Sequence, residues 1–225
     1  MKIMDKNMLF DEDEQERIQA EKTILQYITD SEFIVRFYNC FVTAREVVFI
    51  LEYLPGGNLY TLLERQKHNK LCESNAKYLA AEILLGLEYL HQHCIIYRDL
   101  KLEHIMFDAE GHIKLIDFGF SKILDHPTDT TRTELGSPSY LAPEMLKGEK
   151  YGFSIDWWAY GVLLHEMVLG YTPFEEDDHI RHAVMNTPVR LPWKLCHKTK
   201  KIIKHLLEKN PDKRLGCNSH HAPNL

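Results

Sequence analysis

Hydrophobic residues recur with two different periods along this chain, and the change of period divides it into two parts. Residues 1–4 are typical of the end of a strand, and residues 11–28 follow a helical spacing that begins with four acidic side chains, which are favoured at the positive end of a helix. Two extended runs, 34–41 and 47–51, flank a short polar turn and predict an antiparallel pair. Residues 52–58 contain a proline and two consecutive glycines, so they break any regular element. The chain therefore begins with a strand-rich part and one helix.

Helical patterns dominate after this break. Residues 59–65 predict a short helix, and Ser74 is expected to cap a long one that packs a single apolar stripe inward. Residues 156–169 are apolar nearly all round, which indicates a helix in the centre of the larger domain, with Asp156 as its cap. The last clear helix spans 199–209 and ends at an Asn-Pro pair.

A hairpin is predicted between the long helix and the central one. Residues 105–107 and 113–116 flank an Asp-Ala-Glu-Gly turn, and residues 94–96 form another short apolar run. Residues 113–116 lead into a charged turn that contains Asp117, and residues 94–96 lead into one that contains Asp99. We therefore expect the hairpin to bring the two carboxylates to the same end of one small sheet.

The two carboxylates suggest a particular chemistry when they are taken together with Lys101. Hard oxygen ligands hold Mg²⁺, and a lysine offsets the charge of a phosphate. A solvated loop is the more common explanation for one isolated aspartate, but the ordered set of three favours a site for a divalent metal and a phosphate.

Composition and charge exclude several other classes. The chain has 225 residues, 44% of them hydrophobic, and a formal net charge of −6, which argues against general nucleic-acid binding. Its five cysteines include no CxxC pair and indicate a reducing compartment. No apolar run is long enough to span a membrane and no signal peptide opens the chain. We expect a soluble, cytoplasmic protein, with the nucleus as the alternative.

Two acidic residues occupy apolar helix faces and so require partners. Glu21 lies among the inward-facing residues of the first helix, and a buried carboxylate needs a cation. Arg17 one turn back and Lys2 on the preceding strand are equally good candidates on spacing alone. Glu166 in the central helix needs a cavity or a partner for the same reason. Residues 125–133, by contrast, contain little that could be buried and predict a mobile loop.

Three motifs now carry a family resemblance. Residues 97–101 read Tyr-Arg-Asp-Leu-Lys, residues 117–119 read Asp-Phe-Gly and residues 142–144 read Ala-Pro-Glu, in the order and approximate spacing of the eukaryotic protein kinase signature set. An Asp-Trp-Trp triplet at 156–158 and Arg214 extend the resemblance over essentially the whole chain. The sequence is similar to the AGC group of serine/threonine kinases, such as protein kinase A.

The resemblance implies an α+β, protein-kinase-like fold of two lobes. A small, truncated, β-rich N-lobe would span residues 1–54, a hinge residues 55–58, and a larger, mainly α-helical C-lobe residues 59–225, which is incomplete at its C-terminus. No Gly-rich, phosphate-covering loop precedes Lys2 in this sequence, so a truncated gene product or a partial gene model is expected.

The resemblance also assigns the nucleotide and metal sites. Lys2 would contact the α and β phosphates of ATP and pair with Glu21, which decides the earlier choice against Arg17. Asp99 would accept the proton of the substrate hydroxyl, Lys101 would stabilise the transferring group, and Asp117 would hold Mg²⁺. The other residues implied at the nucleotide are the gatekeeper Leu51, the adenine-binding Glu52 to Leu54, and Met106.

Regulation and substrate choice follow from the same resemblance. Thr133 aligns with the activation-loop phosphosite, which an upstream kinase would phosphorylate. Three nearby threonines are rival acceptors. The phosphate would be bound by a basic trio, and substrates would be proteins phosphorylated on Ser or Thr, with arginine upstream. The residues implied for the trio are Arg17, Arg98 and Lys122, and those implied for the substrate are Glu103, Glu166 and Ser137.

His104 departs from the family pattern. It stands where the family has an asparagine that binds a second Mg²⁺, and imidazole is a poorer ligand for Mg²⁺ than a carbonyl oxygen. Activity could accordingly be reduced, shifted toward Mn²⁺, or lost. The main hypothesis is therefore an ATP-dependent serine/threonine kinase. A pseudokinase that acts as a binding or scaffolding module is the alternative, and the long activation segment disfavours a small-molecule kinase.

Overall fold

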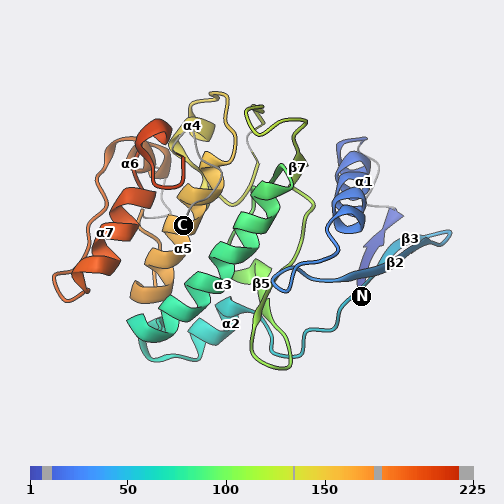
Figure 1. Ribbon diagram of the computed structural model, residues 1–225, viewed down its shortest axis with the longest axis horizontal. Helices are drawn as coiled ribbons and strands as arrows, with labels where there is room; N and C mark the ends of the chain where they lie inside the picture. Colours follow the sequence, from blue (N-terminus) through green and yellow to red (C-terminus); the bar gives the residue numbers. More distant parts are fainter. Residues whose placement is uncertain (7–11, 134, 175–178, 218–225) are drawn as a thin grey trace.

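The structure is a computed structural model, which describes residues 1–6, 12–133, 135–174 and 179–217. A small β-rich lobe lies beside a larger helical one (Figure 1). The small lobe contains a three-stranded antiparallel sheet of order β1-β3-β2 and one helix; its elements are β1 (Lys2–Asp5), α1 (Glu12–Tyr27), β2 (Phe37–Val42) and β3 (Glu46–Leu51). The predicted α+β, two-lobe fold is confirmed.

The central strand β3 and the helix α1 supply the core of the small lobe. Val48 and Phe49 in β3 are buried, and α1 buries Ile24 and Leu25. The register pairs Lys2 with Phe49, so the lysine lies next to the most buried residue of the sheet. The polar turn between β2 and β3 is closed by Thr43, as expected from the sequence.

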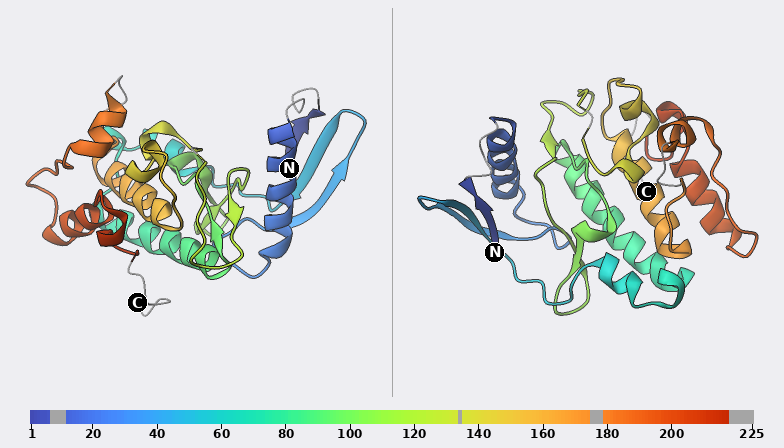
Figure 2. Two further views of the ribbon diagram at one scale, coloured as in Figure 1. Left: turned by 90° about the horizontal axis from the view of Figure 1, so that it is seen from above. Right: turned by 180° about the vertical axis from the view of Figure 1, so that it is seen from behind.

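Helices of the larger lobe pack around α5, which Figure 2 shows from two further sides. Most of α5 is buried, as its nearly continuous apolar sequence predicts. It ends at Gly170, whose φ of 83° is a left-handed conformation that favours glycine. The helices are α2 (Leu59–Glu64), α3 (Glu73–Gln92), α4 (Pro143–Leu146), α5 (Ser154–Leu169), α6 (Ile180–Asn186) and α7 (His197–Leu206).

The predicted hairpin is present, but it does not include the strand before Asp99. Strand β5 (Ile105–Phe107) pairs with β6 (Ile113–Leu115), and Asp108 accepts hydrogen bonds in the turn from the amides of Glu110 and His112. Strand β4 (Ile95–Ile96) pairs instead with β7 (Lys122–Ile123). The prediction of one small sheet was wrong, because the segment after Asp117 turns back to cover β4.

A buried ion pair closes the helical lobe. Arg214 and Glu144 have side chains that are 0% and 2% exposed, and the guanidinium donates to both carboxylate oxygens at 2.6 and 2.8 Å. The Arg214 side chain also donates to the carbonyls of Ser154 and Glu208. This planar, two-point contact ties the segment after α7 to α4 and α5.

Several predicted boundaries and caps were wrong. Cys72, not Ser74, occupies the N-cap of α3, and Ser74 lies inside the first turn. Phe153 is the N-cap of α5, and Asp156 lies inside its first turn with its carboxylate bonded to the Tyr97 amide. The first extended run becomes a strand only at Phe37, and the last helix ends at Leu206. Asp11, predicted to open the first helix, lies outside the described residues.

The sequence patterns missed the short elements α4, α6 and β7. All three are shorter than the windows over which periodicity can be recognised. The buried apolar side chains of both lobes join into a single hydrophobic cluster. Within the described ranges, no helix has the length and apolar character needed to cross a membrane.

Candidate active site

Lys2 joins three elements of the fold. Its ammonium donates to both carboxylate oxygens of Glu21 at 2.8 Å and to Asp117 Oδ1 at 3.0 Å. Glu21 is 2% exposed on α1, whereas Asp117 follows β6. The choice between Arg17 and Lys2 is settled for Lys2, because the Arg17 guanidinium lies over the ring of Phe120, 5.1 Å from its centroid.

Charges within this network stabilise one another. Burial lowers the pKa of Lys2, but Glu21 and Asp117 outweigh that effect and leave the pKa raised, so the ammonium is charged. Burial raises the pKa of Asp117, yet the charge of Lys2 and its hydrogen bond outweigh burial and hold the pKa below its ordinary value. The Asp117 carboxylate is therefore ionised at neutral pH and can serve as an oxygen ligand for a hard cation.

Asp99 forms a second network with Lys101 and Ser137. Lys101 Nζ donates to Asp99 Oδ2 at 3.0 Å and to Ser137 Oγ at 3.1 Å, and Ser137 Oγ donates to Asp99 Oδ1 at 3.2 Å. Asp99 is 4% exposed. A buried carboxylate that accepts one hydroxyl proton and one ammonium proton is arranged to receive a further hydroxyl as general base.

His104 connects the two networks. Its Nδ1 lies 3.0 Å from the Asp99 carbonyl oxygen and 3.3 Å from Asp99 Oδ2, and its Nε2 lies 3.6 Å from Asp117 Oδ2. Burial lowers the pKa of His104, against the opposing influence of Asp99. The ring is therefore neutral at pH 7 and offers one nitrogen lone pair next to the carboxylates. The predicted convergence of Asp99 and Asp117 is confirmed.

The backbone that carries these side chains is fixed by α5. Asp156 accepts hydrogen bonds from the amides of Tyr97 and Arg98 at 2.9 Å and contacts His91 Nε2 at 2.8 Å. Both Arg98 and Asp117 have positive φ, at 69° and 61°, a strained conformation that surrounding contacts must maintain. Asp156 supplies one such contact. Its predicted role as a helix cap was a local interpretation, because sequence spacing gives no sign of a partner 58 residues away.

The residues assigned to adenine lie where the chain passes between the lobes. Leu51 ends β3 and is partly buried, and Leu54 is 7% exposed. The Glu52 carboxylate accepts a hydrogen bond from the Arg36 amide at 3.1 Å and lies 3.4 Å from Lys114 Nζ. These two contacts fix the orientation of the side chain. Met106 in β5 forms a bridge with Asn58, directly after the glycine pair.

Thr133 and its basic trio are not joined by contacts in this structure. The Thr133 side chain is exposed, and its carbonyl accepts a hydrogen bond from Tyr151. Arg98 donates to the carbonyl of Phe120, and the Arg17 guanidinium lies over the same residue's ring. Both arginines thus contact Phe120, whereas Lys122, the third basic residue of the trio, makes a different contact.

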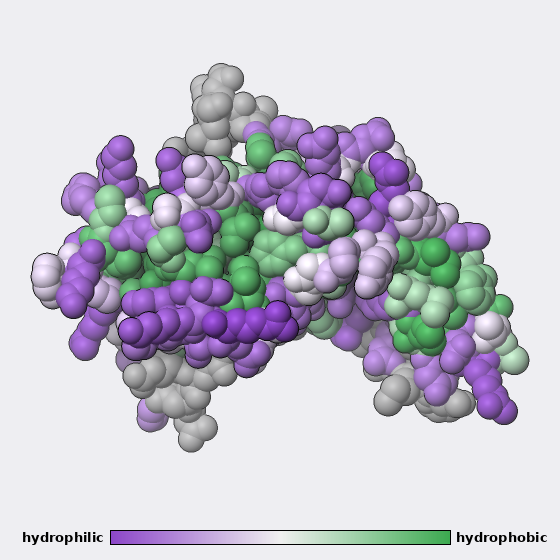
Figure 3. Space-filling model, turned by 90° about the horizontal axis from the view of Figure 1, so that it is seen from below, coloured by the Kyte–Doolittle hydropathy of each residue, from purple (hydrophilic) through white to green (hydrophobic). Residues whose placement is uncertain are grey.

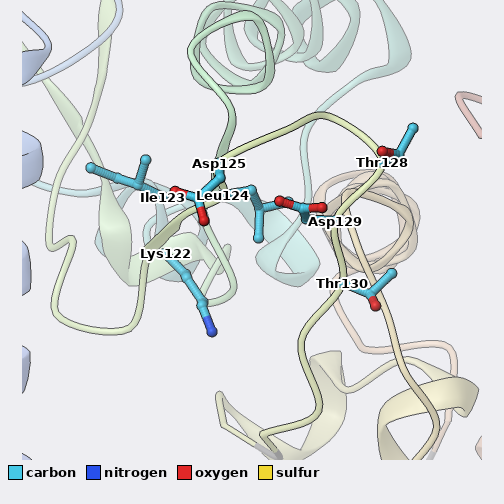
Figure 4. Close-up of a pocket in the computed structure, with 7 residues that line it drawn as sticks. All are labelled: Lys122, Ile123, Leu124, Asp125, Thr128, Asp129 and Thr130. Atoms are coloured by element: carbon cyan, nitrogen blue, oxygen red, sulfur yellow. The ribbon is translucent and has the colours of Figure 1, made fainter.

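Lys122 contacts a rival threonine instead. Its ammonium donates to Thr131 Oγ1 at 3.1 Å, and Thr131, which is 8% exposed, pairs with Tyr151. The loop was expected to contain little that could be buried, and Thr131 is a buried residue within it. A pocket of about 360 Å³ lies beside this segment. Figure 4 shows the residues that line it, which include Thr128 and Thr130.

The residues assigned to substrate recognition gather near Tyr140. Tyr140 donates a hydrogen bond to Glu166 Oε2, and burial, followed by the charge of Glu166, raises the pKa of this tyrosine well above its usual value. Glu103 adds to that effect, and it also adds to the raised pKa of Tyr60, which is due mainly to a hydrogen bond with Glu64. Glu166 therefore has the partner that a carboxylate on the central helix requires. Neither tyrosine was singled out from the sequence, where a phenol gives no sign of its partner.

Taken with the fold, these two networks define a protein kinase domain. The family model for the protein kinase domain matches residues 1–223, and the chain belongs to this family. The protein kinase C zeta type of Oryctolagus cuniculus is 41% identical over 226 residues, which cover 96% of this chain and 38% of the relative. The atypical protein kinase C of Drosophila melanogaster is 40% identical over 233 residues, covering 99% and 38%.

A further relative is the protein kinase C of Drosophila melanogaster, 41% identical over 219 residues, which cover 96% of this chain and 29% of the relative. Protein kinases C are AGC kinases, so the predicted AGC membership is confirmed. The chain spans less than two-fifths of the length of these relatives.

Proposed function

We propose that this chain is the catalytic domain of an ATP-dependent serine/threonine protein kinase, which transfers the γ-phosphoryl group of ATP to serine or threonine hydroxyls of proteins. One observation carries the proposal. The network of Lys2, Glu21 and Asp117 and the network of Asp99 and Lys101 meet at a single place, with neighbouring carboxylates. A scaffold has no physical need for all five residues in this arrangement.

In the proposed site, Lys2 contacts the α and β phosphates. Glu21 holds its ammonium in place at 2.8 Å, which limits the entropy lost when phosphate binds. The backbone of Glu52 to Leu54 meets the adenine edge, while Leu51 and Met106 contact its faces. The hinge at 55–58 separates the lobes 1–54 and 59–225; Gly56 donates to the Phe107 carbonyl at 3.0 Å, and a side chain at Gly56 would collide with Phe107.

Asp99 acts as the general base. Its Oδ1 accepts the Ser137 hydroxyl at 3.2 Å, and a substrate hydroxyl in reach of the same carboxylate would donate in the same way. Lys101 pairs with Asp99 at 3.0 Å and is positioned to stabilise charge on the transferring phosphoryl group. Ser137 positions the peptide beside these two residues.

The donor set fits a divalent cation. Asp117 is an ionised carboxylate, and His104 adds a neutral nitrogen 3.6 Å from it. Asp117 would hold Mg²⁺, which neutralises phosphate charge during transfer, and His104 would favour Mn²⁺ because nitrogen donors suit Mn²⁺ better than Mg²⁺. Both residues also contact neighbouring protein groups, which fixes their orientation before the metal binds.

Substrates are proposed to carry arginine upstream of the phosphoacceptor. Glu103 and Glu166 are the negative charges that surround Tyr140, and a guanidinium can bind carboxylates with two parallel hydrogen bonds. Asn58 does not contribute, since its side chain accepts from the Thr61 amide at 2.8 Å and caps α2.

Activation is proposed to require phosphorylation of Thr133 by an upstream kinase. Arg17 and Arg98 both contact Phe120. A phosphate on Thr133 would attract these two residues and Lys122, and would order the segment through charge-assisted hydrogen bonds. Thr131 is a poorer acceptor because it is buried. We place the protein in the cytoplasm, with the nucleus as the alternative.

The test is a phosphotransfer assay on the full-length gene product in Mg²⁺ and in Mn²⁺. We expect activity that Asp99→Asn lowers by about 10²- to 10⁴-fold, which is the usual contribution of a general base. Equal activity of the wild type and Asp99→Asn in both metals would rule the kinase proposal out. Glu103→Ala with an arginine-containing peptide library separately tests substrate choice.

A pseudokinase is the second candidate, and His104 is the observation that favours it. The ring contacts both Asp99 and Asp117 and therefore occupies space beside the metal ligands. His104→Asn distinguishes the two functions. Gain of activity in Mg²⁺ by this variant supports an enzyme with altered metal preference, whereas nucleotide binding without transfer in either variant supports a binding module.

A further inference from the structure

Residues 190–205 form a basic stretch that contains no aspartate or glutamate. In a chain of net charge −6, this segment carries six arginine and lysine residues and two histidines. Four of the lysines and both histidines lie on α7. Arg190 and Lys194 lie in the segment before it. The six are Arg190, Lys194, Lys198, Lys200, Lys201 and Lys204.

Helix α7 presents part of this charge on an exposed face. Ile203 and Leu206 are buried against the lobe, whereas Lys198, Lys201 and Ile202 are exposed. The spacing of three and four residues places these exposed side chains next to one another on the helix surface. The helix is therefore anchored by one face and leaves a cationic face open.

Within the described residues, no carboxylate pairs with these positive charges. Lys200 Nζ donates to the Trp193 carbonyl at 3.1 Å, and Lys194 Nζ lies 5.8 Å from the Trp193 ring centroid. The nearby Glu73 carboxylate is bonded to the Cys196 amide at 3.1 Å and to Thr199.

Trp193 projects from this cationic surface. It is 83% exposed, whereas Trp158 is fully buried. Ile202, 40% exposed, adds a second apolar side chain among the lysines. A face that met only water would gain nothing from either residue. An indole ring, with its apolar body and polar N–H, prefers the boundary between a lipid bilayer and water.

The location of this surface separates it from the candidate active site. Figure 1 shows α7 at the end of the helical lobe that lies away from the β-rich lobe. Figure 3 shows hydrophilic side chains projecting along the outer edge of the helical lobe. A partner on α7 therefore leaves Asp99 accessible.

We propose that the 190–205 surface binds anionic phospholipid bilayers, with Trp193 and Ile202 in the headgroup region and the lysines against lipid phosphates. Clusters of four to eight basic residues bind anionic leaflets, and interfacial helices combine them with exposed aromatic and aliphatic side chains. A nucleic acid would use the charges, but it offers no apolar environment for Ile202. This proposal is independent of the kinase activity.

The test is flotation of the full-length protein with phosphatidylcholine vesicles that either contain or lack phosphatidylserine. We expect binding only when phosphatidylserine is present, and weaker binding as ionic strength rises. Lys198→Ala/Lys201→Ala is expected to lower the partition coefficient about 25-fold, since each basic residue near the surface contributes about five-fold. Trp193→Ala also lowers it, and Trp193 emission shifts to the blue in bound wild type.

A matched control removes the same charge elsewhere. Lys147 and Lys150 are exposed at and after the end of α4, and Lys147→Ala/Lys150→Ala is expected to bind like the wild type. Thermal unfolding of each variant verifies that it folds. Absence of binding to anionic vesicles, equal loss in the two double variants, or binding of duplex DNA without binding of vesicles would each overturn the proposal.

Discussion

Lys2 on β1 and Glu21 on α1 are joined by two contacts of 2.8 Å, and the glutamate is almost completely buried. The contact links the sheet of the small lobe to its helix. The same ammonium reaches Asp117 at 3.0 Å, so the position of α1 is coupled to the segment after β6. A shift of α1 therefore changes the positions of Lys2, the proposed phosphate-binding residue, and Asp117, the proposed metal ligand, together.

Lys2→Met is expected to destabilise the protein by about 3 kcal/mol at pH 7, because it leaves the Glu21 carboxylate buried without a cation. Burial already raises the folded-state pKa of Glu21 above its ordinary value in the presence of Lys2, and removal of the lysine raises it further. A group with a raised folded pKa stabilises below its unfolded pKa, and that contribution is lost as the pH rises. The deficit of the variant is therefore smaller at pH 5 than at pH 7.

Urea unfolding at both pH values measures this effect. Lys77→Met is the control, since Lys77 is exposed on α3 and its loss should change stability little at either pH. A deficit of Lys2→Met that is independent of pH would show that Glu21 does not titrate as expected.

Arg214→Met is expected to lower stability by about 3–5 kcal/mol, since it leaves the Glu144 carboxylate buried and unpaired. Arg214→Lys retains the charge but not the two-point geometry, so its loss should be smaller. Thermal unfolding of the two variants beside exposed Lys213→Met gives the comparison. Equal melting temperatures for Arg214→Met and Lys213→Met would contradict the structural role of this pair.

Glu166→Gln is expected to reduce kcat/KM for a peptide with upstream arginine by roughly 10-fold or more, because a charge-assisted contact contributes about 1.5–3 kcal/mol. The same change should hardly affect a peptide in which alanine replaces that arginine. Tyr140→Phe serves as a control for orientation, since it removes the hydrogen bond to Glu166 but leaves the charge. A proportional loss on both peptides would indicate a structural role for Glu166.

Lys209→Met is expected to raise stability slightly at pH 7. Lys209 Nζ lies 4.0 Å from the Phe174 ring centroid and 4.9 Å from that of Trp158, and burial lowers the pKa of the ammonium to about 8. Because the folded-state pKa lies below the ordinary 10.5, the wild type gains stability as the pH rises from about 8 toward 10.

The advantage of Lys209→Met should therefore shrink over that pH range. Its size at pH 7 is about 1 kcal/mol or less, because the side chain is partly exposed and solvent screens its charge. Chemical denaturation of both proteins at pH 7 and near pH 10 measures the difference. A variant less stable than the wild type at both pH values would show that the contacts with the rings outweigh the cost of burial.

Long periodic segments were predicted well because their evidence is local. The spacing of apolar residues in α1, α3 and α5 reports which face is buried, whatever the partner. The turn between β5 and β6 was likewise predicted from residues that bond within it, such as Asp108. Elements of a few residues, such as α6 and β7, carry no such period and depend on packing against distant parts of the chain.

The sequence by itself determined the two-lobe organisation, the order of the motifs and the choice of Asp99, Lys101 and Asp117 as candidate reactive residues. Only the tertiary structure decided which side chains meet. It assigned Asp156 to the amides of Tyr97 and Arg98 instead of to a helix cap, and Lys122 to Thr131 instead of Thr133. The physical reason is that propensity and periodicity act between neighbours in the chain, whereas a hydrogen bond depends on distance in space.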